Sequence, residues 1–474
     1  MASNLPDYVA SAQPLAMSAR APWYKNTAQT YAGIMLWFVF WQQVPFGSST
    51  EAGGFLSHGL GTAILALVAA ALICHFLFYV VPGMLGMKTG LPLYIVGTST
   101  YGVQGGLFMP GFLMGVLQFG WLAVNAYFSG LLLVLPFGVA MNSAPHMIVA
   151  AAWAILGAFM GLKGIKYVAR VATFLPLIPF VILIILSVAT IGGLGKFDAN
   201  ALVTSGQAAG AGAPLSTFAL FALMISYVVG FFATAGAAGV DIAMNNPTGK
   251  DVQLGGIFGV ALSTIFAGGL ALLTVAGAYG MAQGDPTAMA GLKGLNPAEM
   301  MGVIMGTKVG AVFMYLLVIA AFPAACFSAF IAANSFKTTL PKVNPLISCG
   351  IGTAVAIALV LSGWAGKAAE NVFPVIGASF GPVCGAMMAD YLLAGRKWAG
   401  PRAGFNMAGW ISWVLGLAVG AVDFIAKIPG LEGLAGKIPC PPVAAFIVGF
   451  VLYLVLAKIG LQSKTLEMPA KAEG

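Results

Sequence analysis

The feature that most constrains this chain is a series of apolar segments, about twelve in number, each with the roughly 20 residues that a helix needs to cross a bilayer. Hydrophobic residues make up 60% of the 474 residues and charged residues only 7%. This composition excludes a soluble globular domain and predicts an all-α integral membrane protein. The predicted spans are 31–50, 59–82, 105–134, 145–162, 171–193, 214–240, 254–280, 302–336, 345–363, 371–394, 405–424 and 441–461.

The basic residues predict how these spans are oriented, because translocated loops avoid Lys and Arg. With the N-terminus in the cytoplasm, all but six of the 21 Lys and Arg residues fall in cytoplasmic segments. We therefore expect a multi-pass protein of the cell inner (plasma) membrane with both termini in the cytoplasm. The net charge of +8 is explained by this topology, so nucleic acid is not an expected partner. The six exceptions are Lys196, Lys293, Lys308, Lys367, Lys427 and Lys437.

Two of the apolar segments are interrupted, one in each half of the chain. The interruptions are the stretches 44–49 (VPFGSS) and 233–239 (ATAGAAG). Broken membrane helices at corresponding places in two halves are typical of a transporter that binds its ligand at the breaks. A packing kink at Pro45 is the simpler alternative for the first stretch.

Several other functional classes lack their usual sequence signals. The chain contains no Walker A sequence, its five cysteines show no CxxC spacing, and its three histidines lie on different segments. An enzyme, a resident cofactor and a disulfide framework are therefore not expected. Energy for transport must then come from an ion gradient, with Na+ or H+ as the coupling ion.

Two segments that are predicted to face the cytoplasm carry a specific resemblance. Residues 86–91 (GMKTGL) and 99–106 (STYGVQGG) resemble the loop before the third span in the purine-cytosine permease and nucleobase-cation symporter family, which includes hydantoin and cytosine permeases. Residues 379–382 (SFGP) and 388–393 (MADYLL) resemble the family's tenth span. The number and order of spans also match, so the resemblance covers nearly the whole chain.

The resemblance implies a LeuT-type fold, in which spans 1–5 and 6–10 form a 5+5 inverted repeat and spans 1 and 6 are broken. On this basis the chain divides into a cytoplasmic N-terminal segment, two repeats, two peripheral helices and a cytoplasmic tail. The expected bounds are 1–30, 31–193, 214–394, 405–461 and 462–474.

The resemblance also implies a binding site for a planar heterocycle. Trp121 and Asn125 are four residues apart and share one helical face, so they offer a ring for stacking and an amide that both donates and accepts. Packing between helices is the alternative role for both. Phe232 in the sixth span matches the family's second stacking residue, and Phe231 takes that role if the alignment shifts by one residue.

Polar groups from three further places complete the implied substrate site. Gln43 matches an amide at the end of the first helical segment, and a slip of one residue exchanges it with Gln42. Gly236 is expected to lend backbone groups at the second break, and Asn334 matches a substrate contact in the eighth span.

A cation site between spans 1 and 8 is the last implied feature. The carbonyl groups of Val39, Gln42 and Ala325 and the hydroxyl of Ser328 are its expected ligands. Ala329 stands where the family has a second hydroxyl. Sodium is a hard cation that needs oxygen ligands, so this loss weakens the site and leaves H+ as the other candidate coupling ion.

No proton relay is evident in the sequence. A single histidine in a membrane helix is more often a hydrogen-bonded packing residue than a proton carrier. Asp241 and Asp390, near the ends of spans, are expected to make gating or anchoring contacts with Lys and Arg. The candidate proton carriers are His75, His58, Glu51, Glu370 and Asp423.

We therefore expect a secondary active transporter, a cation symporter that imports a nucleobase or related planar heterocycle by alternating access. Cytosine, other purines and pyrimidines, hydantoin and allantoin are candidate substrates. The alternative is a transporter of the same fold for an amino acid or a quaternary amine. The expected partners are the small heterocycle and the lipid bilayer, and the sequence does not predict an oligomeric state.

Overall fold

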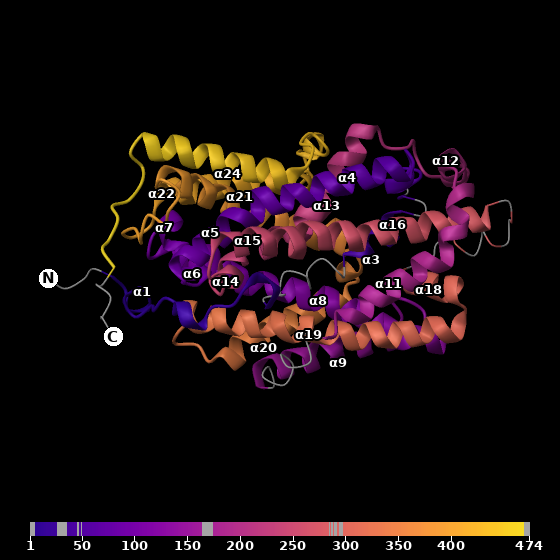
Figure 1. The fold of residues 1–474 in the computed structure, drawn as a ribbon, viewed down its shortest axis with the longest axis horizontal. Helices are drawn as coiled ribbons and strands as arrows, with labels where there is room; N and C mark the ends of the chain where they lie inside the picture. The colour runs from indigo at the N-terminus through magenta and orange to yellow at the C-terminus, as the bar shows by residue number, and fades with distance from the viewer. Residues whose placement is uncertain are drawn as a thin grey trace.

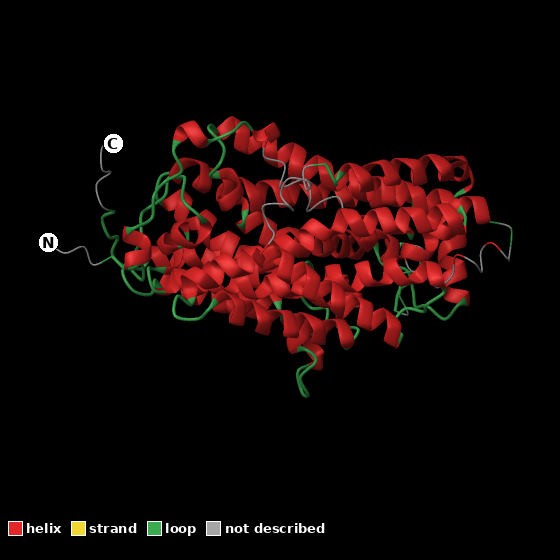
Figure 2. Ribbon diagram, turned by 90° about the horizontal axis from the view of Figure 1, so that it is seen from below, coloured by secondary structure: helices red, strands yellow, loops and turns green. Residues whose placement is uncertain are grey.

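The computed structural model describes residues 5–25, 36–44, 47–48, 50–163, 174–283, 285, 288, 292 and 297–468. Helices dominate these residues, as Figure 2 shows, and the β structure among them is limited to two isolated bridges. Nine of the described helices are long and apolar enough to cross a membrane, and two shorter apolar helices, Pro345–Leu361 and Met407–Gly420, bring the number to eleven. The twelfth predicted span is represented by α3 (Trp37–Gln43).

The first half of the chain contains five predicted spans. The second span is continuous and includes the π-helical segment η4, whereas the third span begins with η5, which is kinked at Met109, where the backbone angles are not helical. The elements are α3, then α4 (Leu60–Ile73) with η4 (Cys74–Tyr79) and α5 (Val80–Thr89), η5 (Leu107–Phe112) with α8 (Leu113–Val134), α9 (Ala144–Lys163) and α11 (Leu177–Thr190).

The second half repeats this order. Its first five spans are α13 (Thr217–Ala237) with α14 (Gly239–Ala243), α15 (Gly249–Gly256) with η8 (Ile257–Leu262) and α16 (Ser263–Ala282), α19 (Thr307–Thr339), α20 (Pro345–Leu361) and α21 (Ala368–Leu393). Two peripheral spans follow, α22 (Met407–Gly420) and α24 (Pro441–Lys458). Shorter helices lie between spans, among them α1 (Asp7–Ala10), α6 (Leu93–Val96), α7 (Thr98–Tyr101), α12 (Ala199–Ala208), α18 (Pro297–Met305) and α23 (Val422–Ile425).

The breaks in the sixth and first spans differ in extent. The predicted interruption at 233–239 is much shorter than expected, because α13 continues through Ala237 and only Ala238 separates it from α14. Alanine has the highest helix propensity, which explains why an alanine-rich stretch keeps its helical hydrogen bonds. In the first span α3 ends at Gln43. Pro45, and with it the alternative of a packing kink, lies outside the described residues.

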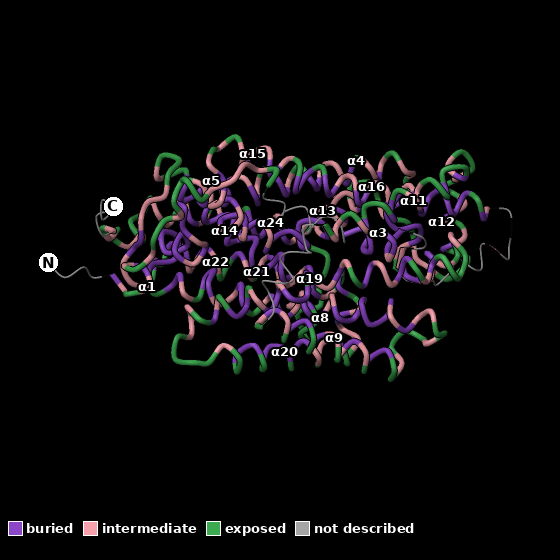
Figure 3. Tube along the Cα trace, turned by 60° about the horizontal axis from the view of Figure 1, so that its bottom comes forward, coloured by how far each residue is buried: buried purple, intermediate pink, exposed green. Residues whose placement is uncertain are grey.

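The helices pack in three groups that run along the length of the molecule (Figure 1). One group contains α8, α9, α19 and α20, and a second contains α21, α22 and α24. Between them lie α4, α13 and α16, with α3 against α16 and α13 against α21. Exposed positions recur along outward-facing helices such as α9 (Figure 3). On α9 the exposed side chains include Ile148, Ile155 and Phe159, as expected where helices meet lipid.

Small residues set the distance between neighbouring helices. A Cβ added at Gly157 of α9 would lie 2.9 Å from the Cβ of Ala325 on α19, and one at Gly161 would lie 2.3 Å from the Cys326 carbonyl oxygen. Ala329 meets the same face, 3.0 Å from the Cβ position of Gly161. Close approach of this kind gives membrane helices the packing that the hydrophobic effect does not supply between them.

Substitution of Gly161 by valine is expected to separate α9 from α19. Overpacking of a tight contact typically costs about 1–3 kcal/mol, so the thermal unfolding temperature of the detergent-purified protein should fall. Gly350→Val in α20 is the matched control, because a Cβ at Gly350 meets no atom within 4 Å. Equal unfolding temperatures for the two variants would contradict the packing explanation.

Candidate functional site

The indole of Trp121 lies where three spans meet. On α8, its ring contacts Phe231 of α13 with centroids 4.9 Å apart and Phe373 of α21 with centroids 5.5 Å apart. Its Nε1 donates to the hydroxyl of Thr234, also on α13, over 3.2 Å. The aromatic cluster of Trp121, Phe231 and Phe373 therefore joins the third, sixth and tenth spans.

The ring that faces Trp121 from the sixth span is that of Phe231. Phe232 is 2% exposed and contacts Phe231, with ring centroids 5.3 Å apart. Successive residues of an α-helix point about 100° apart, so only one of the two rings can face α8 in a given orientation. The one-residue shift that the sequence leaves open corresponds to the observed contact with Trp121.

Two residues that contact Trp121, Thr234 and Phe373, are not predicted from the sequence. Thr234 was named only within the interrupted stretch, where a hydroxyl beside alanines was the available signal. Phe373 carried no signal beyond being an aromatic residue in the tenth span. Its contact with Trp121 depends on how α21 packs against α13.

The Asn125 amide is bonded to neighbouring helices. Its Nδ2 donates to the Ala321 carbonyl oxygen of α19 over 2.9 Å, and its Oδ1 accepts from Trp153 Nε1 of α9 over 3.1 Å. The Ser129 hydroxyl makes a longer contact of 3.4 Å with the same oxygen. In this conformation the amide connects three helices, which is the packing role that the sequence kept as an alternative.

Gln43 is a predicted site residue whose side-chain oxygen accepts no hydrogen bond from another described residue. The side chain is 6% exposed, and its Oε1 has no hydrogen-bond partner among the described residues. The Gln43 carbonyl is approached so closely by Gly54 that a Cβ there would lie 1.7 Å from its oxygen. A buried acceptor without a partner is costly, so Gln43 offers the strongest polar attachment point for a ligand within the predicted set.

Gly236 and Asn334 have different surroundings from those predicted. Gly236 packs against span 2, where an added Cβ would lie 2.9 Å from the Cβ of Phe78, and its carbonyl accepts the Ala238 amide. Asn334 is exposed on α19. Its neighbour Ser335 donates to the carbonyl of Gly111 in η5. Among the described residues, no hydrogen bond joins Gly236 or Asn334 to the aromatic cluster.

The predicted cation ligands lie on α3 and α19, two helices that do not pack mainly against each other. Val39 and Gln42 belong to α3, which packs mainly against α16 with smaller contacts to α18 and η3. Ala325 and Ala329 face the glycines of α9, and Ser328 between them is buried. Among the described residues, no group of three or more His, Cys, Asp or Glu side chains could hold a metal ion.

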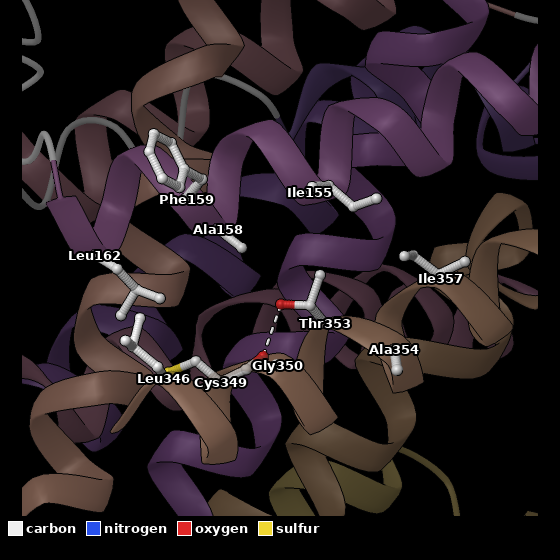
Figure 4. Close-up of a pocket in the computed structure, with 10 residues that line it drawn as sticks. All are labelled: Ile155, Ala158, Phe159, Leu162, Leu346, Cys349, Gly350, Thr353, Ala354 and Ile357. Carbon is white, nitrogen blue, oxygen red and sulfur yellow. Dashed lines mark hydrogen bonds between the residues drawn. The ribbon is translucent and has the colours of Figure 1, made fainter. Parts of the chain in front are cut away.

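Two cavities lie away from these residues. A cavity of about 340 Å³ between α9 and α20 has an almost wholly apolar lining, and Figure 4 shows its one marked hydrogen bond, from the Thr353 hydroxyl to the Cys349 carbonyl. A cavity of about 540 Å³ lies among α13, α21 and the segment between α22 and α24. None of the predicted substrate residues lines either of them.

Asp390 anchors one end of the molecule. Its Oδ1 lies 3.1 Å from Arg402 Nη2 in a buried ion pair and accepts from the Tyr453 hydroxyl over 2.8 Å, while Ser99 donates to its Oδ2. Arg402 Nε also donates to the Ser99 carbonyl over 2.8 Å. The expected anchoring contact between Asp390 and a basic residue is therefore confirmed.

Asp241 makes a different contact from the one expected. Its Oδ1 accepts the backbone N–H of Leu93, at the start of α6, over 2.8 Å, and no Lys or Arg is paired with it among the described residues. The carboxyl therefore joins α14 to the start of α6.

Together, a bundle of apolar spans, a sixth span divided at Ala238 and an aromatic cluster where three spans meet define a polytopic α-helical transport protein. The chain is 26% identical over 443 residues to the cytosine permease of Escherichia coli (strain K12), an alignment that covers 91% of this chain and 92% of the relative. No family model matches the chain.

Solved structures of transporters share the fold. The inward-facing conformation of Mhp1 matches with a TM-score of 0.69 and 15% identity over 98% of this chain and 97% of that one. Mhp1, a nucleobase-cation-symport-1 family transporter, also matches in a closed conformation with bromovinylhydantoin bound, with a TM-score of 0.62 and 14% identity over 97% and 98% of the two chains. A Na+-coupled sialic acid symporter matches with a TM-score of 0.55 and 15% identity over 95% and 92%.

These relatives confirm the predicted resemblance and the LeuT-type fold. The chain is thus similar along most of its length to a cytosine permease, and it shares its fold with a nucleobase-cation-symport-1 transporter. The relatives are permeases and transporters rather than enzymes.

Removal of the buried charge at Asp390 should destabilise the protein strongly. Asp390→Asn leaves the Arg402 guanidinium without its counter-ion, and breaking a buried pair typically costs about 3–5 kcal/mol. The double variant Asp390→Asn/Arg402→Met should lose less than the sum of the single variants, as measured by thermal unfolding. Glu370→Gln, in the exposed pair with Lys367 at 3.9 Å, is the control and should change stability by less than about 1 kcal/mol. Additive losses would show that Asp390 and Arg402 are not coupled.

Proposed function

We propose that this chain is a cation-coupled symporter that imports cytosine or a closely related planar nucleobase. The observation that carries the proposal is the aromatic cluster of Trp121, Phe231 and Phe373, which lies between three spans of a chain homologous to a cytosine permease. An indole held at such a junction gives a flat ring a surface on which to stack.

Recognition in this proposal starts from Trp121. Thr234 holds the indole N–H, so the orientation of the ring is tied to α13. Gln43 supplies an acceptor without a partner, which suits the N–H groups along the edge of a nucleobase. Asn125, bonded to α9 and α19, holds α8 in place, and it reads the substrate only if the ligand replaces one of these bonds.

Phe231 and Phe373 are proposed to move during the cycle. Both contact Trp121 and lie 5.3 Å from each other, so a ligand that stacks on the indole must change the arrangement of α13 and α21 around α8. Motion of the sixth and tenth spans against the third is what alternating access requires of a fixed binding site. Phe232 remains the alternative stacking ring if α13 rotates by one residue.

We propose that the protein lies in the plasma membrane with both termini in the cytoplasm. The chain's two described ends are attached to one cluster of loops, because the Tyr8 hydroxyl donates to the Val103 carbonyl and the Leu466 N–H donates to the Pro401 carbonyl over 2.7 Å. The Val103 N–H in turn donates to the Arg402 carbonyl over 2.7 Å. The two described ends of the chain thus lie at the same end of the helix bundle, which supports an even number of spans.

The coupling ion is proposed to be H+ or a weakly held Na+. Na+-coupled symporters share the fold. Here, however, Ala325 and Ala329 pack against the glycines of α9, and Ala329 offers no hydroxyl. Asn334, Val39, Gln42 and Ser328 keep their predicted roles only in a conformation that brings α3 and α19 to the aromatic cluster, and Gly236 only in one that frees it from Phe78 of span 2.

Replacement of Trp121 tests the proposal. Trp121→Ala should weaken cytosine binding by about 5- to 150-fold, because stacking contributes about 1–3 kcal/mol per base. Saturable uptake of labelled cytosine into proteoliposomes should fall accordingly, while Trp121→Phe should retain part of it.

The matched control is Trp413→Ala on the peripheral span α22, where the indole likewise donates to one partner, the Ser379 carbonyl, over 3.0 Å. This variant should bind cytosine normally. Unchanged uptake by Trp121→Ala, or saturable uptake of amino acids and not of heterocycles by the wild type, would refute the proposed site or the proposed substrate class.

A further inference from the structure

Spans 2 and 7 carry π-helical segments that pack against each other. The segments are η4 (Cys74–Tyr79) and η8 (Ile257–Leu262), and each lies within an otherwise continuous membrane helix. Spans 2 and 7 occupy equivalent positions in the two halves of a 5+5 fold, so the distortions are paired. Segments of π-helix inside α-helices are frequent at functional sites because they disturb the regular hydrogen bonding of the backbone.

The imidazole of His75 is buried at this crossing and makes no hydrogen bond to another described residue. His75 lies on η4 and is 0% exposed, and within the described part of the chain neither Nδ1 nor Nε2 has a partner of acceptable geometry. Gly256 on α15 lies against it, so closely that an added Cβ would be 2.5 Å from Nδ1. Gln253, three residues earlier, is the polar side chain that interacts with the ring.

His146 shows what a packing histidine looks like in the same protein. It is also 0% exposed, but its Nε2 is paired with the Tyr127 carbonyl at 2.9 Å and its Nδ1 accepts the Asn142 N–H over 3.1 Å. The structural role expected of a lone membrane histidine therefore fits His146. It does not fit His75, whose ring nitrogens remain available.

The surroundings of His75 disfavour a positive charge in this conformation. Among the described residues, the ring contacts are with Phe76 and Tyr79, and the ring forms no ion pair with a carboxylate. An unpaired cation in an apolar interior is costly, so the ring is neutral here. The titratable groups on η4 and the elements packed against it are Cys74, Tyr79, Lys88, Tyr227, Lys250, Asp251, Glu370, Cys384, Asp390, Tyr391, Tyr453 and Lys458.

We propose that His75 is the site where the coupling proton binds during transport. In a conformation where the crossing of η4 and η8 opens, a free ring nitrogen takes a proton from water on one side of the membrane. Return to the conformation described here expels that proton to the other side and restores the neutral ring. The only bond that forms and breaks is the imidazole N–H bond.

The free energy for coupling comes from the difference in the proton affinity of His75 between the two conformations. A ligand shifts a conformational equilibrium only by its differential affinity for the two states, and the buried ring gives the proton such a difference. The equilibrium should then change by up to about tenfold per pH unit. The proposal rests on the proposed function and supplies the coupling that a sodium site without the Ala329 hydroxyl lacks.

The test uses the full-length protein in proteoliposomes that contain no sodium. We expect an inward proton gradient to drive accumulation of labelled cytosine by the wild type, together with proton influx that a trapped pH dye reports. His75→Gln should retain exchange of cytosine across the membrane but lose at least about nine-tenths of gradient-driven accumulation, because glutamine is polar but cannot titrate.

His146→Gln is the matched control and should keep coupled accumulation per folded protein while its unfolding temperature falls. Accumulation by His75→Gln equal to that of the wild type would overturn the proposal. If His75→Gln does not fold, the wild type alone decides: accumulation driven by a sodium gradient, with no proton influx on addition of cytosine, would also overturn it. Absence of cytosine exchange by the wild type would instead refute the proposed function, and the role of His75 with it.

Discussion

The hydrocarbon core of the membrane is the constraint on which the rest of this structure depends. Without water, each backbone N–H and C=O must be bonded within the protein, which explains why the described spans are helical and why the break at Ala238 is confined to a single residue. The same environment removes the hydrophobic drive between helices. Glycine contacts such as Gly161 against Cys326 therefore set the packing, and the face of α19 that carries small residues packs against α9.

This constraint also separates polar side chains that hold the structure from those that are free to act. Asn125 is half-buried and His146 and Asp390 are buried, and all three are bonded to groups on other segments, so they connect helices. The Gln43 oxygen and the His75 ring are buried without such bonds among the described residues. Since an unpaired buried polar group is costly, their retention points to a bond that forms in another state of the protein, with a ligand or with a proton.

Two parts of the molecule differ in how firmly they are joined. The network around Asp390 ties the tenth and twelfth spans to the loop after span 2 through a buried ion pair and several hydrogen bonds. The aromatic cluster at Trp121 is held by ring contacts and one hydrogen bond. Contacts of the second kind are readily exchanged for a planar ligand, which suits a site that must open and close around fixed anchors.

The sequence by itself determined the helical membrane fold, the order of its spans and the resemblance to nucleobase permeases, because apolar length, charge distribution and local motifs are readable along the chain. It could not decide between Phe231 and Phe232, show that Asn125 bonds to α9 and α19, or separate His75 from His146. Those outcomes depend on which residue faces a neighbour distant in sequence. Helix rotation and packing fix that, and only the tertiary structure contains them.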